Sequence, residues 1–288
     1  MITIGLFNSM GANVPGYFDY IDELAADTDI ICLSEVHDYH GEQTLVTLHG
    51  DDKNNRVGPI HLKKFTVLQE QLSVTHYGRF DTAFHGYHDC RAEPGVRQGL
   101  AMFSREPFEV GLAGRALIHG PFDHTWDGVR PATRIIQSQV VPLDTHRVLL
   151  VAHVHGLWIP AGKVDCHYRD EQTERILAYL RMWVHTLTRS GLKVGVVLGG
   201  DFNYTRKLEC YRNLIRGWDW EEGGAFPLVL NAMVPDGFNT RTQYYPADKP
   251  TREADFVLTS PFLWSEPRIY RDVPSDHAVI RTPIVWHQ

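Results

Sequence analysis

Short apolar runs recur along the whole chain, and this recurrence most constrains the fold that the sequence can adopt. Each run is rich in Ile, Val, Leu or Phe and is bounded by polar or Gly-containing segments, which is typical of buried β-strands. The expected strands are Ile2–Phe7, Asp29–Leu33, Gly99–Phe103, Arg134–Val141, Val148–Val154, Val194–Leu198, Phe256–Leu258 and Ala278–Ile284. None approaches the ~18 apolar residues needed to cross a bilayer, so we expect no membrane partner.

Two segments between these runs have a helical pattern instead. In Arg169–Leu187, apolar residues recur at spacings of three and four, and Tyr17–Ala26 is the second such segment. The chain has no Pro/Ser-rich linker and no internal repeat, and its hydrophobic content of 43% is enough for a packed core. These features favour one mixed α/β domain over residues 1–288 with a large sheet core.

Long polar segments connect several of these elements. They are rich in Gly, Pro, Asp, His and Arg, and we expect them to be loops. The segments are Tyr39–Val57, His85–Arg97, Ile118–Pro131 and Pro235–Arg252. Loops of this length in a compact domain often carry function.

The charge balance and the cysteines exclude some classes of protein. Lys plus Arg total 28 against 35 for Asp plus Glu, a net charge of −7, which is the wrong sign for a protein held on nucleic acid by its bulk field. It does not forbid a local basic groove or a bound metal. The cysteines form no C-x-x-C pair and the first residues lack the pattern of a signal peptide, so we expect a reduced, cytoplasmic protein.

Polar side chains end several of the predicted strands. Asn8 and His155 directly follow an apolar run, Glu35 follows one after Ser34, and Asp201 follows one after Gly199-Gly200. A carboxylate or imidazole is costly to bury, so such residues are expected at the rim of a sheet, where several rims together form a polar site on a rigid support. The alternative for each residue alone is an ordinary strand terminus.

The segment Gly199–Asn203 holds an acid and an amide two residues apart. If the chain stays extended here, Asp201 and Asn203 point to one face and converge on one small target. The preceding glycines let the backbone leave the strand sharply. The alternative for Asp-x-Asn is an Asx-turn.

Acidic side chains and an imidazole also lie close together in the sequence near the C-terminus. Asp276 and His277 precede the last predicted strand, and Asp255 begins the strand before it. An imidazole can carry protons near neutral pH, and a carboxylate can fix its tautomer. Alternatively, Asp276 and His277 occupy an ordinary turn and Asp255 is a capped strand end.

In the order of its polar residues, the chain resembles the endonuclease/exonuclease/phosphatase superfamily. The residues that carry the resemblance are Asn8, Glu35, His155, Gly-Asp201-Phe-Asn203, Asp255 and Ser-Asp276-His277. The resemblance runs from residue 8 to residue 277. It implies a four-layer α/β sandwich, with two packed mixed β-sheets flanked by helices, forming one catalytic domain. It also implies hydrolysis of a phosphoester with Mg²⁺ or Mn²⁺.

The same resemblance implies metal ligands. Glu35 would be the main ligand, Asn8 would lie beside the metal and the phosphate, and Asp276 would add a second carboxylate nearby. Hard divalent cations prefer oxygen ligands, which agrees with this set.

The catalytic roles are implied in the same way. Asp201 would orient or deprotonate the attacking water, and Asn203 would hold a phosphate oxygen. His277, held by Asp255, would stabilise the transition state. These roles agree with the charge that develops during phosphoryl transfer.

The site histidine has two candidates on one strand. The stretch from His153 to Asp165, followed by Arg169-x-x-Gln172, is similar to the "histidine-leucine, then R-x-x-Q" stretch of deoxyribonuclease-like and sphingomyelinase-like members. Apurinic endonucleases usually have tyrosine there. We assign His155 to the site rather than His153, whose alternative is a hydrogen-bonded core histidine. A His-x-His pair also suggests a zinc hydrolase, although the Asp-His continuation of the metallo-β-lactamase pattern is absent.

Arginines near the predicted strands and loops are candidates for substrate binding. Arg97 and Arg134 lie at strand starts, and Arg241 lies shortly before Asp255. Each could grip a phosphate, and the alternative is a solvated loop arginine.

Three functions follow from this reading. The first is a metal-dependent nuclease that cleaves a nucleic-acid phosphodiester by water attack, with DNA favoured over RNA as substrate and a monomeric state. The second keeps the chemistry on a small or lipid phosphoester, such as an inositol phosphate or sphingomyelin. The third is an inactive binding protein, whose signature would be loss of Glu35, Asp201 or His277, and all three residues are present.

Overall fold

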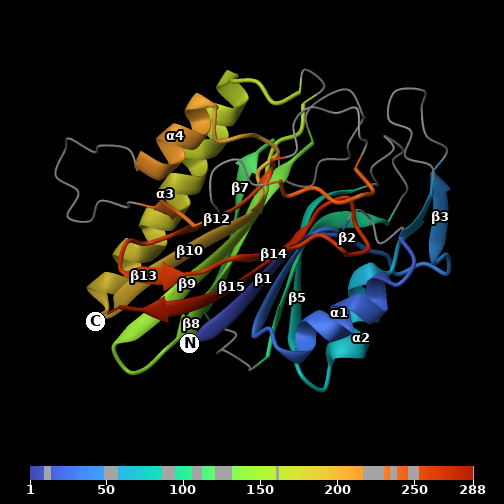
Figure 1. The fold of residues 1–288 in the computed structure, drawn as a ribbon, viewed down its shortest axis with the longest axis horizontal. Coiled ribbons are helices and arrows are strands. Elements are labelled where there is room, and N and C mark those ends of the chain that lie inside the picture. Colours follow the sequence, from blue (N-terminus) through green and yellow to red (C-terminus); the bar gives the residue numbers. More distant parts are fainter. Residues whose placement is uncertain are drawn as a thin grey trace.

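Two β-sheets pack face to face, and helices cover the outer face of each sheet (Figure 1). The computed structural model describes residues 1–9, 14–48, 58–85, 95–105, 112–120, 132–159, 162–216, 230–233, 239–245 and 253–287. The helices are α1 (Tyr17–Ala26), α2 (Lys64–Leu72), α3 (His167–Arg189) and α4 (Glu209–Arg216). The first two cover one sheet and the last two cover the other, so the predicted four-layer α/β sandwich is confirmed.

The first sheet carries the N-terminal strand at its centre. Its strands are β1 (Ile2–Asn8), β2 (Ile30–Asp38), β5 (Tyr77–His85), β6 (Arg97–Ser104), β13 (Leu263–Ser265), β14 (Arg268–Tyr270) and β15 (Val279–Trp286). They are ordered β13-β15-β1-β2-β6-β5, and β14 also pairs with β15. Strands β1 and β2 are parallel, so Asn8 and Ser34 are register partners and Glu35 follows at the same edge.

The second sheet is built around two parallel strands. Its strands are β7 (Ala113–His119), β8 (Arg134–Pro142), β9 (Arg147–His155), β10 (Lys193–Asp201), β11 (Asn231–Ala232) and β12 (Asp255–Thr259). They are ordered β11-β12-β10-β9-β8-β7. In this register Asp201 pairs with both His155 and Asp255, so three predicted site residues lie abreast at one edge.

Each predicted apolar run overlaps one of these strands, and both predicted helices are present. The loop predicted over Tyr39–Val57 is wrong in part, because Leu45–Leu48 forms β3, which pairs antiparallel with β4 (Gly58–His61). The sequence Leu-Val-Thr-Leu favours an extended chain once a partner strand is near. Residues 39–44 form no helix or strand, as predicted, whereas residues 49–57 and most of the other three predicted loops lie outside the described residues.

The amphipathic helices bury one face each. In α3, Ile176, Leu177 and Leu180 are buried against the second sheet, as their spacing of one and three residues predicts. In α1, Ile21 and Leu24 are buried against the first sheet. No helix in the described part of the chain is long and apolar enough to span a membrane.

Apolar side chains fill most of the space between the sheets, and at Gly199 the absence of a side chain lets the backbones approach closely. Leu6 of β1 packs directly on Gly199 of β10, and a Cβ on Gly199 would lie 2.3 Å from Leu6 Cδ1. Asn8 and Asp201 follow these two residues, each two positions further along its strand. The close packing at Gly199 therefore sets how near the two polar strand ends come to each other.

We expect Gly199→Ala to lower the free energy of unfolding by about 1–3 kcal/mol, because the added methyl overlaps the Leu6 side chain. In a Leu6→Ala background the same change should cost at least ~0.5 kcal/mol less, since the overlap is removed. Urea unfolding of the single and double variants measures both values. Strictly additive costs would contradict this packing.

Candidate active site

The polar strand ends of the two sheets converge on one point. Asn8 Nδ2 donates hydrogen bonds to Glu35 Oε1 at 3.2 Å and to Asp201 Oδ2 at 2.9 Å. His155 Nε2 lies 3.9 Å from each of the same two carboxylate oxygens. All four side chains are largely buried. The structure thus brings together the four residues that sequence places at strand ends.

Glu35 occupies an unusual backbone conformation. A β-bulge interrupts the pairing of β2 with β6 between Leu33 and Val36, and Glu35 has φ of 56°. A bulge changes the direction of a side chain, and a left-handed conformation is uncommon for a residue other than Gly. Both features turn Glu35 toward Asn8 and His155.

The chain turns sharply after Asp201. Asn203 N donates to Asp201 Oδ1 at 2.8 Å, and Asn203 has φ of 56°, so an Asx-turn forms and the extended arrangement considered from sequence is wrong. The turn still brings Asn203 to the site, where its Nδ2 donates to Gly156 O at 3.1 Å. One carboxylate oxygen of Asp201 therefore holds the turn, while the other faces Asn8.

His277 lies between two carboxylates. Its Nδ1 is 3.0 Å from both oxygens of Asp255, and its Nε2 is 3.5 Å from Asp201 Oδ2. Thr240 Oγ1 accepts hydrogen bonds from the backbone N–H groups of Ala254 and Asp255, which fixes the start of β12. The arrangement holds Nδ1–H on Asp255 and directs Nε2 into the site.

Arg241 and Asp276 complete this side of the site. The Arg241 guanidinium contacts His277 Nε2, lies 3.6 Å from Asp276 Oδ2 and stacks on the Tyr245 ring at 4.6 Å. Asp276 Oδ1 is 3.9 Å from His277 Nε2. The predicted substrate-binding Arg241 and the predicted acidic residue Asp276 are therefore both brought beside His277.

The charges of the site follow from burial and from these neighbours. Burial would raise the pKa of Asp201, but His277, His155 and Arg241 outweigh it and lower the pKa to about 2. Burial, together with the nearby Arg134, lowers the pKa of His155 to about 3. At neutral pH Asp201 is thus an anion and His155 a neutral imidazole.

The balance at His277 has the opposite sign. Burial and Arg241 lower the pKa of His277, but Asp255, Asp201 and Asp276 raise it further, so the net shift is upward. The imidazolium form therefore persists above the ordinary value of about 6.5. It is lost as the pH rises through the raised pKa.

His153 lies one layer deeper than His155. It is fully buried, and its Nε2 is 3.1 Å from Ser34 Oγ of the opposite sheet. Burial lowers the pKa of His153 to about 3. The structure places His155 against the carboxylates and His153 in the space between the sheets.

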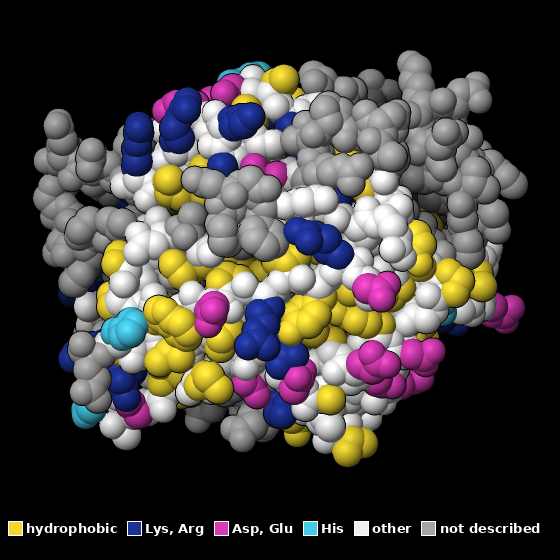
Figure 2. Space-filling view, viewed as in Figure 1, with side chains coloured by type: hydrophobic (Ala, Val, Ile, Leu, Met, Phe, Trp, Pro, Cys, Tyr) yellow, Lys and Arg dark blue, Asp and Glu magenta, His cyan; other side chains and the backbone are white. Residues whose placement is uncertain are grey.

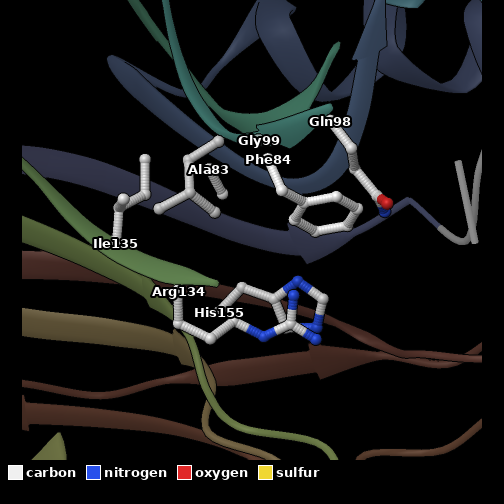
Figure 3. Close-up of a pocket in the computed structure, with 8 residues that line it drawn as sticks. Ala83, Phe84, Gln98, Gly99, Arg134, Ile135 and His155 are labelled. Carbon is white, nitrogen blue, oxygen red and sulfur yellow. The ribbon is translucent and has the colours of Figure 1, made fainter. Parts of the chain in front are cut away.

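Arg134 lines a small pocket beside His155. Figure 3 shows both side chains facing the Phe84 ring, with Gln98 on the same side as Phe84. Arg134 Nε donates to Gly156 O at 2.9 Å, and the guanidinium carbon lies 5.9 Å from the centre of the Phe84 ring. Burial lowers the pKa of Arg134 to about 10, so the group remains a cation at neutral pH.

Arg97 lies away from this group. It pairs with Asp38, lies 2.7 Å from His40 Nε2 and stacks over the Phe80 ring. Its contacts are thus with neighbouring strand residues rather than with the central carboxylates. The structure does not bring Arg97 into the site with Arg134 and Arg241.

The donor set fits a hard divalent cation. Glu35 and Asp201 direct carboxylate oxygens at one amide, and Asn8 contributes a carboxamide, which are the ligand types that Mg²⁺ and Mn²⁺ prefer. Ligand atoms of Asp201, Asp255 and His277 also lie within 4.8 Å of one another. In that second group Asp255 already accepts the Nδ1–H of His277.

Sequence reasoning noted Arg169-x-x-Gln172 only as part of the resemblance and assigned it no role, and it missed other supporting residues. Gln172 Oε1 accepts a hydrogen bond from Leu157 N at 2.8 Å, and Arg169 Nη2 donates to Asn203 O at 3.1 Å, so the R-x-x-Q pair braces the loop after β9. Its motif could have identified that role. Lys163, which donates to Glu253 O, and buried Lys64 have no motif to mark them.

We expect Asp255→Asn to lower the pKa of His277, because it removes the carboxylate that most stabilises the imidazolium. NMR titration of the imidazole C–H resonances in the metal-free protein measures this shift. His76, which is buried and hydrogen-bonded to Thr28 O, serves as an internal control whose pKa should not move. An unchanged or raised pKa of His277 would contradict the assigned contact.

Solved structures from several organisms share this fold. An endonuclease/exonuclease/phosphatase from Bacteroides vulgatus has a TM-score of 0.65 at 16% identity, covering 99% of this chain and 99% of its own. Bacteroides thetaiotaomicron mannosyl-6-phosphatase Bt3783 has a TM-score of 0.62 at 16% identity over 99% and 100%. The human Nocturnin catalytic domain with bound sulfate has 0.59 at 16% over 99% and 94%. At these identities the similarity shows the fold alone.

Comparison of the sequence itself assigns the family. No curated protein matches the chain. The model of the Endonuclease/Exonuclease/phosphatase family matches residues 7–277, a span that contains the whole convergent site. The chain therefore belongs to the endonuclease/exonuclease/phosphatase family, whose members are generally hydrolases and typically depend on a divalent metal.

Proposed function

We propose that this protein is a divalent-metal-dependent phosphodiesterase that cleaves nucleic acid, with DNA favoured, by attack of water. The observation that carries the proposal is the convergence of Asn8, Glu35, His155 and Asp201 with the Asp255–His277 pair at one edge of both sheets. Anionic, neutral and cationic groups stand within a few ångströms of one another there. A phosphoester hydrolase needs this combination.

The ionised carboxylate of Asp201 orients the attacking water by accepting its hydrogen bond. The water oxygen forms the new P–O bond, the bond to the leaving oxygen breaks, and the water proton finally resides on the leaving group. His277, as an imidazolium, donates from Nε2 to a phosphoryl oxygen, and Asp255 holds its ring. Neutral His155 directs its Nε2 toward the carboxylates of Glu35 and Asp201, 3.9 Å from an oxygen of each.

Glu35 would be the main ligand of Mg²⁺ or Mn²⁺, with Asn8 beside it and Asp276 as a further carboxylate nearby. When bound, the cation polarises the phosphate and offsets the charge of the carboxylates. The buried Arg134, near His155, and the buried Arg241, beside His277, add fixed positive charge to the site. Phosphate binding is therefore expected to depend on the metal and on these two arginines.

The surface charge supports a polyanionic substrate despite the net charge of −7. Figure 2 shows Lys and Arg side chains over α4 with Asp and Glu side chains beside them, and Asp and Glu side chains near α1. Lys207, which precedes α4, and Arg212, which pairs with Glu209, are exposed. Glu209 N donates to Asp165 Oδ1, which joins the start of α4 to the segment before α3. The exposed cations thus lie at the end of the fold where Asn203 and Arg169 meet.

Cleavage of plasmid DNA and of labelled single- and double-stranded oligonucleotides tests the proposed activity. We expect EDTA to abolish cleavage and excess Mg²⁺ to restore it. Asp201→Asn should lower kcat by about 10²–10⁴, because the amide cannot accept the proton of the water in the same way. Circular dichroism controls for folding. Cleavage by the variant at the wild-type rate would refute the assignment, and release of phosphate from small phosphomonoesters alone would favour the second candidate.

Reversing charge at Lys207, which precedes α4, and at Arg212 within α4 tests the nucleic-acid part of the proposal. We expect Lys207→Glu with Arg212→Glu to raise KM for an oligonucleotide about tenfold at low salt and less at high salt, since exposed charges are screened. Hydrolysis of bis(p-nitrophenyl) phosphate should not change. Arg189→Glu with Lys193→Glu, exposed at the far ends of α3 and β10, is the matched control. Equal effects of both double variants on the oligonucleotide would contradict the proposal.

A further inference from the structure

Lys64, at the start of α2, is a fully buried cation close to the candidate site. Its Nζ donates hydrogen bonds to Ser9 Oγ and to Glu35 O, both at 2.7 Å, and lies 5.4 Å from the centre of the Tyr17 ring. Both oxygens are neutral acceptors. Burying an ammonium group in this way lowers stability, so we expect Lys64 to have a role in the neighbouring structure that offsets this cost.

That role concerns the backbone conformation of Glu35. Ser9 N and Ser9 Oγ both donate to Ser34 O, at 3.2 and 2.6 Å, which holds the peptide group that precedes Glu35. Lys64 Nζ donates to Glu35 O, which holds the peptide group that follows it. The two peptide planes around the Glu35 Cα are therefore both fixed by side chains outside β2.

This matters because Glu35 sits in a β-bulge with φ of 56°. A left-handed non-Gly residue persists only when its surroundings hold it there. A relaxed backbone would turn the carboxylate away from Asn8, whose Nδ2 donates to Glu35 Oε1. Burial lowers the pKa of Lys64 well below its ordinary value, and the attraction of the Glu35 carboxylate opposes this shift.

We propose that Lys64, assisted by Ser9, is a positioning residue that holds Glu35 in its left-handed conformation and so preorganises the site for a divalent cation. The inference rests on the proposed function, since it assigns the cation to Glu35. It makes Lys64 part of the metal site without contact between its ammonium and the metal. A purely structural Lys64 would only fasten α2 to β2.

Lys64→Met separates these two roles. Methionine is similar in volume and removes both the charge and the donors. We expect the Kd for Mn²⁺, measured by calorimetry, to rise by about tenfold or more, as for other residues that orient a ligand. The stability of the metal-free protein toward urea should be unchanged or higher, because a buried charge is removed. Lys63→Met, at the adjacent and more exposed lysine, should change neither quantity.

Equal Kd values for Mn²⁺ in the wild type and in Lys64→Met would overturn the role of Lys64 and leave the proposed function intact. A wild type that binds no Mn²⁺ would overturn both. If Lys64→Met does not fold, Ser9→Ala decides, because it removes one acceptor of the ammonium and one of the two donors to Ser34 O. Weaker Mn²⁺ binding in folded Ser9→Ala supports the proposal, and an unchanged Kd contradicts it.

Discussion

The close approach of β1 and β10 across the sheet interface underlies the whole site. Leu6 packs against Gly199, where no side chain intervenes, and two residues further along each strand Asn8 Nδ2 reaches Asp201 Oδ2 at 2.9 Å. A larger residue at position 199 would push the sheets apart at this point. The two sheets belong to different parts of the chain, so one packing contact decides whether their polar ends can act together.

The site concentrates features that a stable core would avoid. Glu35 and Asn203 are the non-Gly residues with positive φ in the described structure, and both lie in the site. Buried carboxylates stand beside buried cations, and the pKa values of Asp201 and His277 shift in the directions that keep one an anion and the other a cation. Strain and desolvation of this kind are typical of functional sites, where neighbouring contacts offset them.

The acidity of the chain acquires a local meaning. Asp201, Asp255, Asp276 and Glu35 contribute to the net charge of −7, yet they are gathered in one buried region. Arg241 offsets part of this charge, and the proposed divalent cation would offset more of it.

Sequence predicted what depends on local pattern and missed what depends on tertiary contact. The strand ends at Asn8, Glu35, His155 and Asp201 were identifiable because polar residues there interrupt apolar runs. Strands β5 and β7 were not, since their residues are mostly half-buried and Gly, Arg and other polar residues interrupt the apolar ones. Nothing in the sequence marks Lys64, because its role arises from a contact with the backbone of a strand far away in the chain.

The most direct test of this account is the position of the metal itself. A crystal of the protein soaked in Mn²⁺ and measured by anomalous diffraction would locate the ion without reference to any substrate. The account predicts an anomalous peak in contact with the carboxylate of Glu35, next to Asn8. A peak elsewhere in the molecule, or none at saturating Mn²⁺, would contradict it.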